Sequence, residues 1–356
     1  MTHALLSPLT LGSLALKNRV IMAPMTRSRA TLDDLVTDLH VDYYSQRASA
    51  GLIISEGAHP SADGKGYCRT PGIFSDQHIA AWRAVTEAVH QKGGLIACQV
   101  MHCGRVGHPD NKAPTSRTLA PSAIACQDEI YTERGMQKMV LPTAMTVEDI
   151  EQTIADYRRA ALNARAAGFD AIELHFTSGY LPAQFLSTGT NQRDDEYGGS
   201  LANRLRFPLA LVKACSEAIG AGRIGVRVCP GNPFNGLSDD NPQETFRALF
   251  EELSHCELAW LHVIRMPSTG IDNIALAKQH YRGAIIVNDS FKFDEAEQVV
   301  AAGDIAAVSF GRAFIANPDL VERFSHGWPL SKIDFSTLYT PGAAGFTDYP
   351  TYSDGQ

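Results

Sequence analysis

Residues 284–311 read AIIVNDSFKFDEAEQVVAAGDIAAVSFG. A short apolar run at 284–288 precedes an amphipathic helical stretch, and a second apolar run follows at 306–311. Strands of a parallel sheet are buried on both faces, so they read as continuous apolar runs rather than alternating ones. The stretch therefore predicts one strand–helix–strand unit of a parallel sheet.

The same unit recurs along the chain. Apolar runs that predict six further strands lie at 19–24, 51–57, 95–100, 171–175, 224–229 and 259–264. The helical stretches between them carry start and stop signals, such as Thr146 with Asp149 three residues later, and Gly168 beyond the last turn. About eight consecutive units predict a single-domain TIM (β/α)8 barrel of the α/β class, covering residues 1–356.

A doubly wound sheet is the alternative fold, but no G-x-G-x-x-G motif follows the first predicted strand. Before that strand, LTLGSLALKN (9–18) predicts a small hairpin that turns at Gly12-Ser13 and covers the bottom of the barrel. Residues 103–145 form a long insertion after the third barrel strand. Loops that follow strands lie on the catalytic face of this fold, so the insertion is expected there.

Composition narrows the class of protein. The chain has 356 residues, 44% of them hydrophobic, and a net charge of −8, so nucleic acid and anionic membrane surfaces are not expected partners. No apolar run approaches the roughly 20 residues of a membrane span, and no signal peptide is evident. Seven cysteines without C-x-x-C spacing predict free thiols in the cytoplasm, with no disulfide framework and no metal site.

Polar side chains stand at the carboxyl ends of the predicted strands. One such residue alone is usually structural, but several strands that each deliver a hydrogen-bonding group to the same face predict a ligand site. The residues concerned are Thr26, Gln99, His102, His175, Arg227, Asn288, Gly311 and Arg312.

The last two strand ends predict a site for phosphate. The turn NDSFKFD (288–294) follows the seventh strand, and Gly311-Arg312 follows the eighth. In TIM barrels these two loops commonly bind a phosphate group through backbone N–H groups and a guanidinium. Many phosphorylated ligands would satisfy this pattern, so the pattern does not select one of them.

Longer segments resemble a known family in register and in order. The chain resembles the Old Yellow Enzyme family of flavin-dependent ene-reductases from about residue 5 to residue 352, and Thr26 resembles its classical branch. The resemblance implies an FMN-binding TIM barrel that reduces activated alkenes with NADPH or NADH. The segments that carry it are RVIMAPMTRSR (19–29), YYSQRASAGLIISEG (43–57), IELH (172–175), GYLPAQFLSTGTNQRDDEYGGSLANRLRF (179–207), SFGRAFIANPDL (309–320) and GFTDYP (345–350).

The resemblance also implies roles for residues around FMN. Thr26 would hydrogen-bond the flavin carbonyl beside the reactive N5, and Arg227 would lie at the pyrimidine edge. The residues that would line the isoalloxazine are Pro24, Met25, Thr26, Gly57 and Gln99. The residues that would hold the phosphate are Asn288, Asp289, Ser290, Gly311 and Arg312.

On the substrate side, the resemblance assigns His175 as a hydrogen-bond donor, Tyr180 as the proton donor and Tyr349 as a side chain over the substrate. Hydride addition to an activated alkene builds negative charge on a carbonyl or nitro oxygen. A donor placed there stabilises the transition state by about 3–4 kcal/mol. A tyrosine with an ordinary pKa of about 10 is a competent acid toward the carbanion that forms.

Two positions depart from the family pattern. Ser178 stands where relatives carry a second histidine or an asparagine, so it either donates a weaker hydrogen bond to substrate or merely caps the turn. Met101 stands where relatives often carry a tryptophan. It either widens the substrate channel or leaves a gap that another side chain fills.

The expected function is an NAD(P)H-dependent alkene reductase acting on α,β-unsaturated carbonyl or nitro compounds. A redox-neutral FMN-dependent isomerase and a flavin-binding protein without efficient alkene turnover are the alternatives. The retained Tyr180 argues against the isomerase. The expected partner is a small electrophilic alkene, and the chain is expected to be a monomer or a homodimer.

Overall fold

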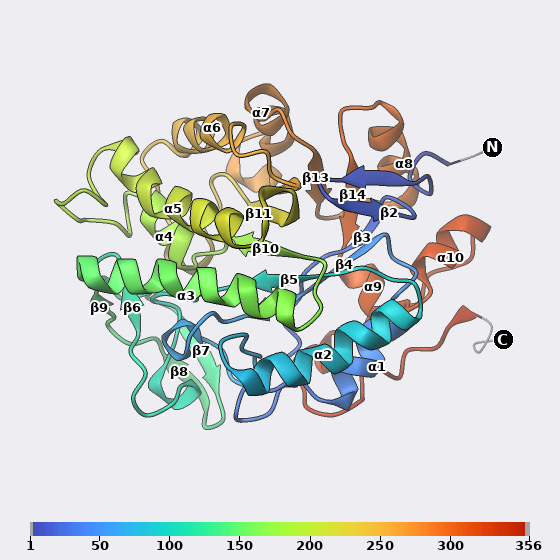
Figure 1. Cartoon of the computed structure of the whole chain (residues 1–356), viewed down its shortest axis with the longest axis horizontal. Coiled ribbons are helices and arrows are strands. Elements are labelled where there is room, and N and C mark those ends of the chain that lie inside the picture. The colour runs from blue at the N-terminus through green and yellow to red at the C-terminus, as the bar shows by residue number, and fades with distance from the viewer. Residues whose placement is uncertain (1–2, 353–356) are drawn as a thin grey trace.

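A computed structural model describes residues 3–352 of the chain. Its centre is a closed barrel in which eight strands pair in parallel, in the order β10-β11-β12-β13-β14-β3-β4-β5 (Figure 1). The predicted TIM barrel is therefore confirmed. The barrel strands are β3 (Val20–Met22), β4 (Leu52–Ala58), β5 (Ile96–Val100), β10 (Ala171–His175), β11 (Ile224–Val228), β12 (Trp260–Ile264), β13 (Ile285–Asn288) and β14 (Ala307–Phe310).

Helices surround the barrel on the outside (Figure 1). The predicted start of α3 is confirmed, because the Asp149 N–H donates to Thr146 Oγ1 over 3.2 Å and the Thr146 N–H donates to Asp149 Oδ2 over 3.1 Å. The helices are α1 (Asp38–Gln46), α2 (Asp76–Gln91), α3 (Val147–Ala166), α4 (Leu181–Leu186), α5 (Leu201–Ile219), α6 (Pro242–Leu253), α7 (Asn273–His280), α8 (Phe293–Ala301), α9 (Arg312–Ala316) and α10 (Leu320–His326).

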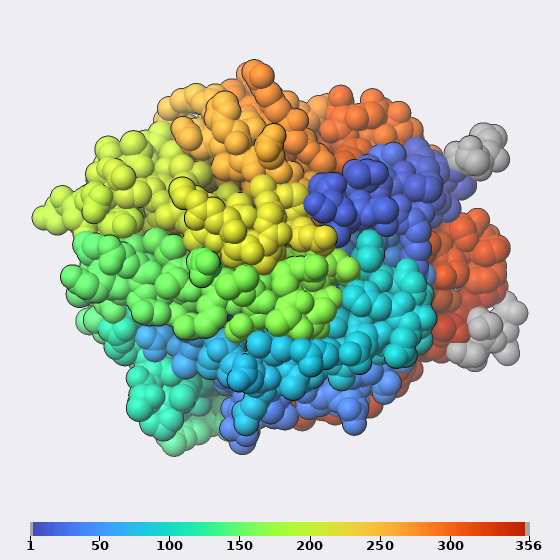
Figure 2. All heavy atoms as spheres, in the orientation of Figure 1, coloured from blue at the N-terminus to red at the C-terminus, as the bar shows by residue number. Residues whose placement is uncertain are grey.

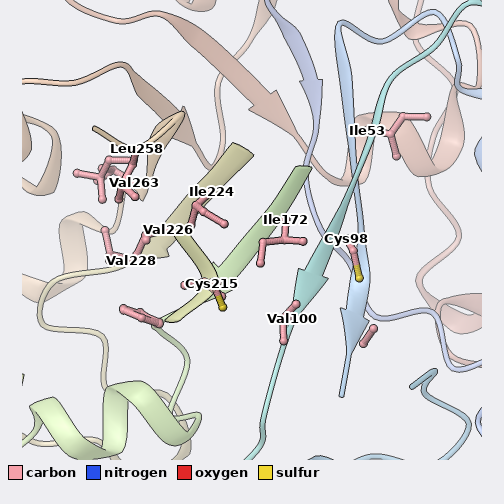
Figure 3. Packing of buried hydrophobic residues seen from close by; sticks show 14 of the residues in the cluster. Ile53, Cys98, Val100, Ile172, Cys215, Ile224, Val226, Val228, Leu258 and Val263 are labelled. Atoms are coloured by element: carbon pink, nitrogen blue, oxygen red, sulfur yellow. The ribbon is translucent and has the colours of Figure 1, made fainter. Parts of the chain in front are cut away.

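The two faces of each barrel strand have different surroundings. Ile172, Ile224 and Val226 belong to the large apolar cluster that fills the space between strands and helices (Figure 3). Successive side chains of a strand point to opposite faces, so the residues that alternate with these point into the barrel. Glu173 and Arg227 are such residues, and the upper interior of the barrel is consequently polar.

The N-terminal hairpin of β1 (Leu9–Leu11) and β2 (Leu14–Leu16) closes the bottom of the barrel, as predicted. Its buried leucines pack with Trp260. The Ser13 N–H donates to Gly222 O over 2.8 Å, and the hairpin lies against this part of the chain in Figure 2. Gly12 has φ +57°, and a Cβ there would lie 2.3 Å from Gly222 O, so this turn requires glycine.

The insertion after β5 is more ordered than a plain loop. It contains β6 (Leu119–Ala120), which pairs with β9 (Thr143–Ala144), and the hairpin of β7 (Glu129–Thr132) and β8 (Gly135–Lys138). These strands lie together at one side of the barrel (Figure 1). Within residues 3–352, no helix has both the length and the apolar character that crossing a membrane requires.

Candidate active site

A cavity of about 490 Å³ opens at the carboxyl ends of β3, β11, β13 and β14. Ligand pockets for small molecules and cofactors commonly enclose about 300–1,000 Å³. Eight of the eleven residues predicted to bind FMN line the cavity, which confirms that they lie together. These eight are Pro24, Met25, Arg227, Asn288, Asp289, Ser290, Gly311 and Arg312.

The outer end of the cavity suits a phosphate group. Arg312 Nη2 lies 3.4 Å from Ser290 Oγ and 3.5 Å from Asp289 Oδ1, and the Arg312 side chain is 60% exposed. Asp289 and Ser290 adopt φ values of +84° and +60°, a backbone strain that clusters at ligand sites. The Asp289 carboxylate would repel an anion, so only its backbone N–H can contribute to phosphate binding.

Beneath this cavity, a buried ionic chain crosses the barrel. Arg227 donates to Asn288 Oδ1 over 2.7 Å and to His262 Nε2 over 2.6 Å, and His262 Nδ1 lies 2.7 Å from Glu173 Oε2. Burial alone would raise the pKa of Glu173, but His262 and Arg227 hold it at about 2. The Arg227 guanidinium therefore has a permanent counter-charge, and it forms part of the cavity wall.

The same carboxylate orients His175. Glu173 Oε1 accepts a hydrogen bond from Gln99 Nε2 over 2.9 Å, and this amide nitrogen also lies 3.3 Å from His175 Nδ1. Burial and the charge of Arg227 lower the pKa of His175 to about 3, so the ring is neutral at physiological pH. Because Nδ1 accepts from the amide, the single proton of the ring is on Nε2.

Tyr180 lies next to His175, with ring centroids 5.0 Å apart. The phenol is buried, and burial raises its pKa well above the ordinary value. Tyr180 also begins α4, where its backbone carbonyl accepts from the Gln184 N–H over 2.9 Å. The structure thus brings a neutral imidazole donor and a protonated phenol together at the end of β10.

Ser178 occupies the turn between these two side chains, with φ +59°. Its backbone carbonyl accepts from Asn235 Nδ2 over 2.7 Å. Within residues 3–352 its hydroxyl makes no hydrogen bond, so the hydroxyl does not cap the turn. The Met101 side chain is buried against Gly57, where an added Cβ would lie 2.7 Å from Met101 Cε.

Three predicted FMN residues lie outside the cavity lining. Gly57 packs closely against Met101, and the Gln99 amide is held by Glu173 and His175. Thr26 is partly exposed at the end of β3, and its hydroxyl has no hydrogen-bond partner among residues 3–352. His102 is buried, accepts from the Gly104 N–H over 3.1 Å and has a pKa lowered by burial to about 3, which marks it as structural.

The prediction that Tyr349 overhangs the substrate stays a prediction. The Tyr349 hydroxyl accepts from the Asp334 N–H over 2.8 Å, and its phenol lies near Arg47. The C-terminal tyrosine close enough to raise the pKa of Tyr180 is Tyr339. Arg29 anchors that segment, because its guanidinium donates to the carbonyls of residues 337, 338, 342 and 344.

Sequence reasoning also missed four residues of the site. Glu173 and His262 carried a usable signal, because a charged or imidazole group inside an otherwise apolar barrel strand has to find a partner. Tyr67 and Asn235 carried none, because each lies in a loop far from Tyr180 in the sequence. Only the folded chain shows that these two side chains lie beside the predicted acid.

Comparison with known proteins agrees with this site. The model of the NADH:flavin oxidoreductase / NADH oxidase family matches residues 4–331. A relative from Leishmania infantum named probable flavin mononucleotide-dependent alkene reductase is 42% identical over 355 residues, covering 97% of both chains. The structure of morphinone reductase in complex with tetrahydroNAD is 43% identical with a TM-score of 0.94, covering 99% of this chain and 98% of that one. The old yellow enzyme from Trypanosoma cruzi is 37% identical with a TM-score of 0.94, covering 98% and 99% respectively.

The chain belongs to the NADH:flavin oxidoreductase / NADH oxidase family, and it is a flavin-dependent oxidoreductase. Membership confirms the predicted family, the enzyme class, FMN as cofactor and a reduced nicotinamide as reductant.

Proposed function

We propose that the chain reduces activated C=C bonds of α,β-unsaturated carbonyl or nitro compounds. The observation that carries the proposal is the pair of a neutral His175 and a protonated Tyr180, whose rings are 5.0 Å apart at the carboxyl end of β10. The similarity to proteins named alkene reductase and 12-oxophytodienoate reductase supports it. When bound, FMN would supply the hydride that the alkene carbon receives.

The residues of the chain have separate tasks in this proposal. His175 donates its Nε2 proton in a hydrogen bond to the carbonyl or nitro oxygen, where negative charge develops. Tyr180 gives its phenolic proton to the neighbouring carbon. The Glu173 carboxylate, acting through Gln99, keeps the imidazole in the tautomer that donates.

Around FMN, Arg227 would bind the pyrimidine edge of the flavin, and Thr26 would bind the carbonyl beside N5. Arg312, Ser290 and the backbone N–H groups of 288–290 and Gly311 would bind the phosphate. The set of Pro24, Met25, Gly57 and Gln99 would complete the flavin site. The free hydroxyl of Ser178 would face the substrate.

An anaerobic half-reaction experiment tests the proposal. The purified protein should be yellow, lose its colour with NADPH or NADH, and regain it with 2-cyclohexenone. Tyr180→Phe should lower enone turnover by about 10²–10⁴-fold and leave bleaching by the nicotinamide within a few-fold. Tyr131→Phe, which changes an exposed tyrosine in the insertion, serves as the matched control.

Two results would contradict the proposal. A colourless protein that binds only sugar phosphates would remove the flavin site. Conversion of enone isomers without consumption of NAD(P)H would favour a redox-neutral isomerase instead.

A further inference from the structure

The hydroxyl of Tyr180 is hydrogen-bonded to a second tyrosine, Tyr67. It donates to the hydroxyl of Tyr67 over 3.1 Å, and the two rings meet edge to face at 90° with centroids 6.3 Å apart. Tyr67 belongs to the loop between η1 (Ala62–Gly64) and α2. Tyr67 is only partly buried, whereas Tyr180 is 9% exposed.

Asn235 connects this pair to the turn at Ser178. Its Nδ2 donates to Ser178 O over 2.7 Å, and its side chain lies close enough to the Tyr67 hydroxyl to oppose in part the rise that burial causes in the pKa of that phenol. Asn235 is thus a donor toward Tyr67. Three hydrogen-bonding groups consequently run in sequence from Tyr180 through Tyr67 to Asn235.

The backbone holds Asn235 firmly in place. Its φ is +55°, a left-handed conformation that asparagine tolerates better than most residues. Its carbonyl accepts from Arg105 Nη2 over 2.9 Å and from Cys126 Sγ over 3.3 Å. A Cβ on Gly179 would lie 2.5 Å from Asn235 Cβ, so the two loops are in close contact at this point.

The hydrogen bond from Tyr180 to Tyr67 bears on how Tyr180 recovers its proton after each turnover. Once Tyr180 has given up its proton, a phenolate remains in a buried site whose surroundings disfavour charge. The nearest group able to return a proton is the Tyr67 hydroxyl. Burial raises the pKa of Tyr67 as well, but the Tyr67 side chain is more exposed than that of Tyr180, and Asn235 can donate to its oxygen when that oxygen becomes negative.

We propose that Tyr67 and Asn235 are positioning residues that hold the Tyr180 phenol and restore its proton from solvent in each turnover. The inference rests on the proposed function, because it assumes that Tyr180 is the acid. A C–H bond forms as the Tyr180 O–H bond breaks. The Tyr180 O–H then reforms as the Tyr67 O–H breaks, and Tyr67 takes a proton from water. No electrons leave or enter these residues, and the net proton comes from solvent.

A nitroalkene separates the two halves of the reaction. Hydride addition to 1-nitrocyclohexene produces a nitronate, an anion stable enough to be observed before it is protonated on carbon. Two rates are measured with the FMN-loaded enzyme: consumption of the nitroalkene, and conversion of added nitronate to nitroalkane. Tyr67→Phe and Asn235→Ala are compared with Tyr180→Phe and with the control Tyr131→Phe, whose tyrosine is 50% exposed.

We expect Tyr67→Phe to slow nitronate protonation about tenfold and to slow nitroalkene consumption by a much smaller factor. Asn235→Ala should slow protonation by a smaller factor in the same direction. A role in packing alone would change both rates together. FMN content and melting temperature of each variant report on folding, and Tyr67→Phe keeps the ring that packs at this position.

Two other outcomes would overturn the inference. If Tyr180→Phe stops protonation while Tyr67→Phe and Asn235→Ala protonate the nitronate at the parent rate, the inference is overturned and the proposed function stands. If Tyr180→Phe itself protonates the nitronate at the parent rate, the proposed acid is wrong and the inference is overturned with it.

Discussion

Ser178 lies in the turn between His175 and Tyr180. The turn it occupies is strained, with φ +59°, and its hydroxyl caps nothing among residues 3–352. The chain therefore keeps a left-handed backbone at this position and presents a short, neutral hydroxyl between His175 and Tyr180. Asparagine adopts such a backbone more readily than serine, so the position accepts the longer side chain.

We predict that Ser178→Asn binds p-hydroxybenzaldehyde more tightly than the parent enzyme. A second donor to the phenolate oxygen contributes about 1.5–3 kcal/mol, or tenfold or more in affinity. Titration of the oxidised enzyme measures both the affinity and the long-wavelength charge-transfer absorption. Ser178→Ala is the control, and it should bind as the parent does. A parent enzyme that already binds tightly with a strong band would refute this prediction.

Residues at the ends of barrel strands can be located from the sequence, whereas residues of the C-terminal segment cannot. His175 and Arg227 could be predicted to share one end of the barrel because each ends or interrupts an apolar strand, whereas Tyr180 was assigned only from the family resemblance. The position of Tyr349 could not be derived from strand ends, because the C-terminal segment has no strand to fix it. Its course is set by Arg27 and Arg29, which donate to carbonyls between residues 337 and 345.

At the scale of elements, the eight barrel strands could be predicted because continuous apolar runs identify buried parallel strands. The small strands β6 and β9 could not, because each has two residues and depends on a partner more than 20 residues away. The loop that carries Asn235 was equally beyond prediction. It reaches Tyr180 only because β10 and β11 are neighbours in the closed barrel.

The contact between the ends of β4 and β5 leads to a prediction about substrate size. Met101 follows β5 and packs its Sδ and Cε against Gly57 in β4. A tryptophan cannot fold into this space, so its ring would extend toward the site. We expect Met101→Trp to lower kcat/KM for a bulky cyclic enone about tenfold more than for 2-cyclohexenone. Met136→Trp, at an exposed position in β8, is the control, and an unchanged ratio between the substrates would rule the idea out.

At the scale of the whole molecule, buried histidines and a buried carboxyl make the free energy of unfolding depend on pH. Several buried histidines have a pKa that burial lowers, and at least four of them are held neutral in the folded chain. The pKa is about 3 for His40, His102 and His175, and about 4 for His262. One buried carboxyl acts in the opposite direction, because burial raises the pKa of Glu56 to about 7.

The sign of the effect follows from proton counting. Between pH 4.5 and 6.5 the unfolded chain binds protons on these four histidines, whereas the folded chain binds one on Glu56, so these five groups together take up about three protons on unfolding. The histidine contribution to stability is therefore present above about pH 6.5 and is lost as pH falls through this window, and the smaller contribution of Glu56 runs in the opposite direction. The free energy of unfolding should decrease by about 4 kcal/mol per pH unit, at about 1.4 kcal/mol per proton.

Urea unfolding of the holoenzyme at pH 7.5, 6.5, 5.8 and 5.2, followed by circular dichroism, measures this slope. His102→Asn removes one of the buried rings at a position outside the proposed reaction, so its slope should be smaller by about one proton. His255→Gln, which replaces an exposed histidine, is the matched control and should keep the parent slope. A free energy of unfolding that stays constant or rises on acidification would mean that the buried imidazoles are not held neutral by the fold.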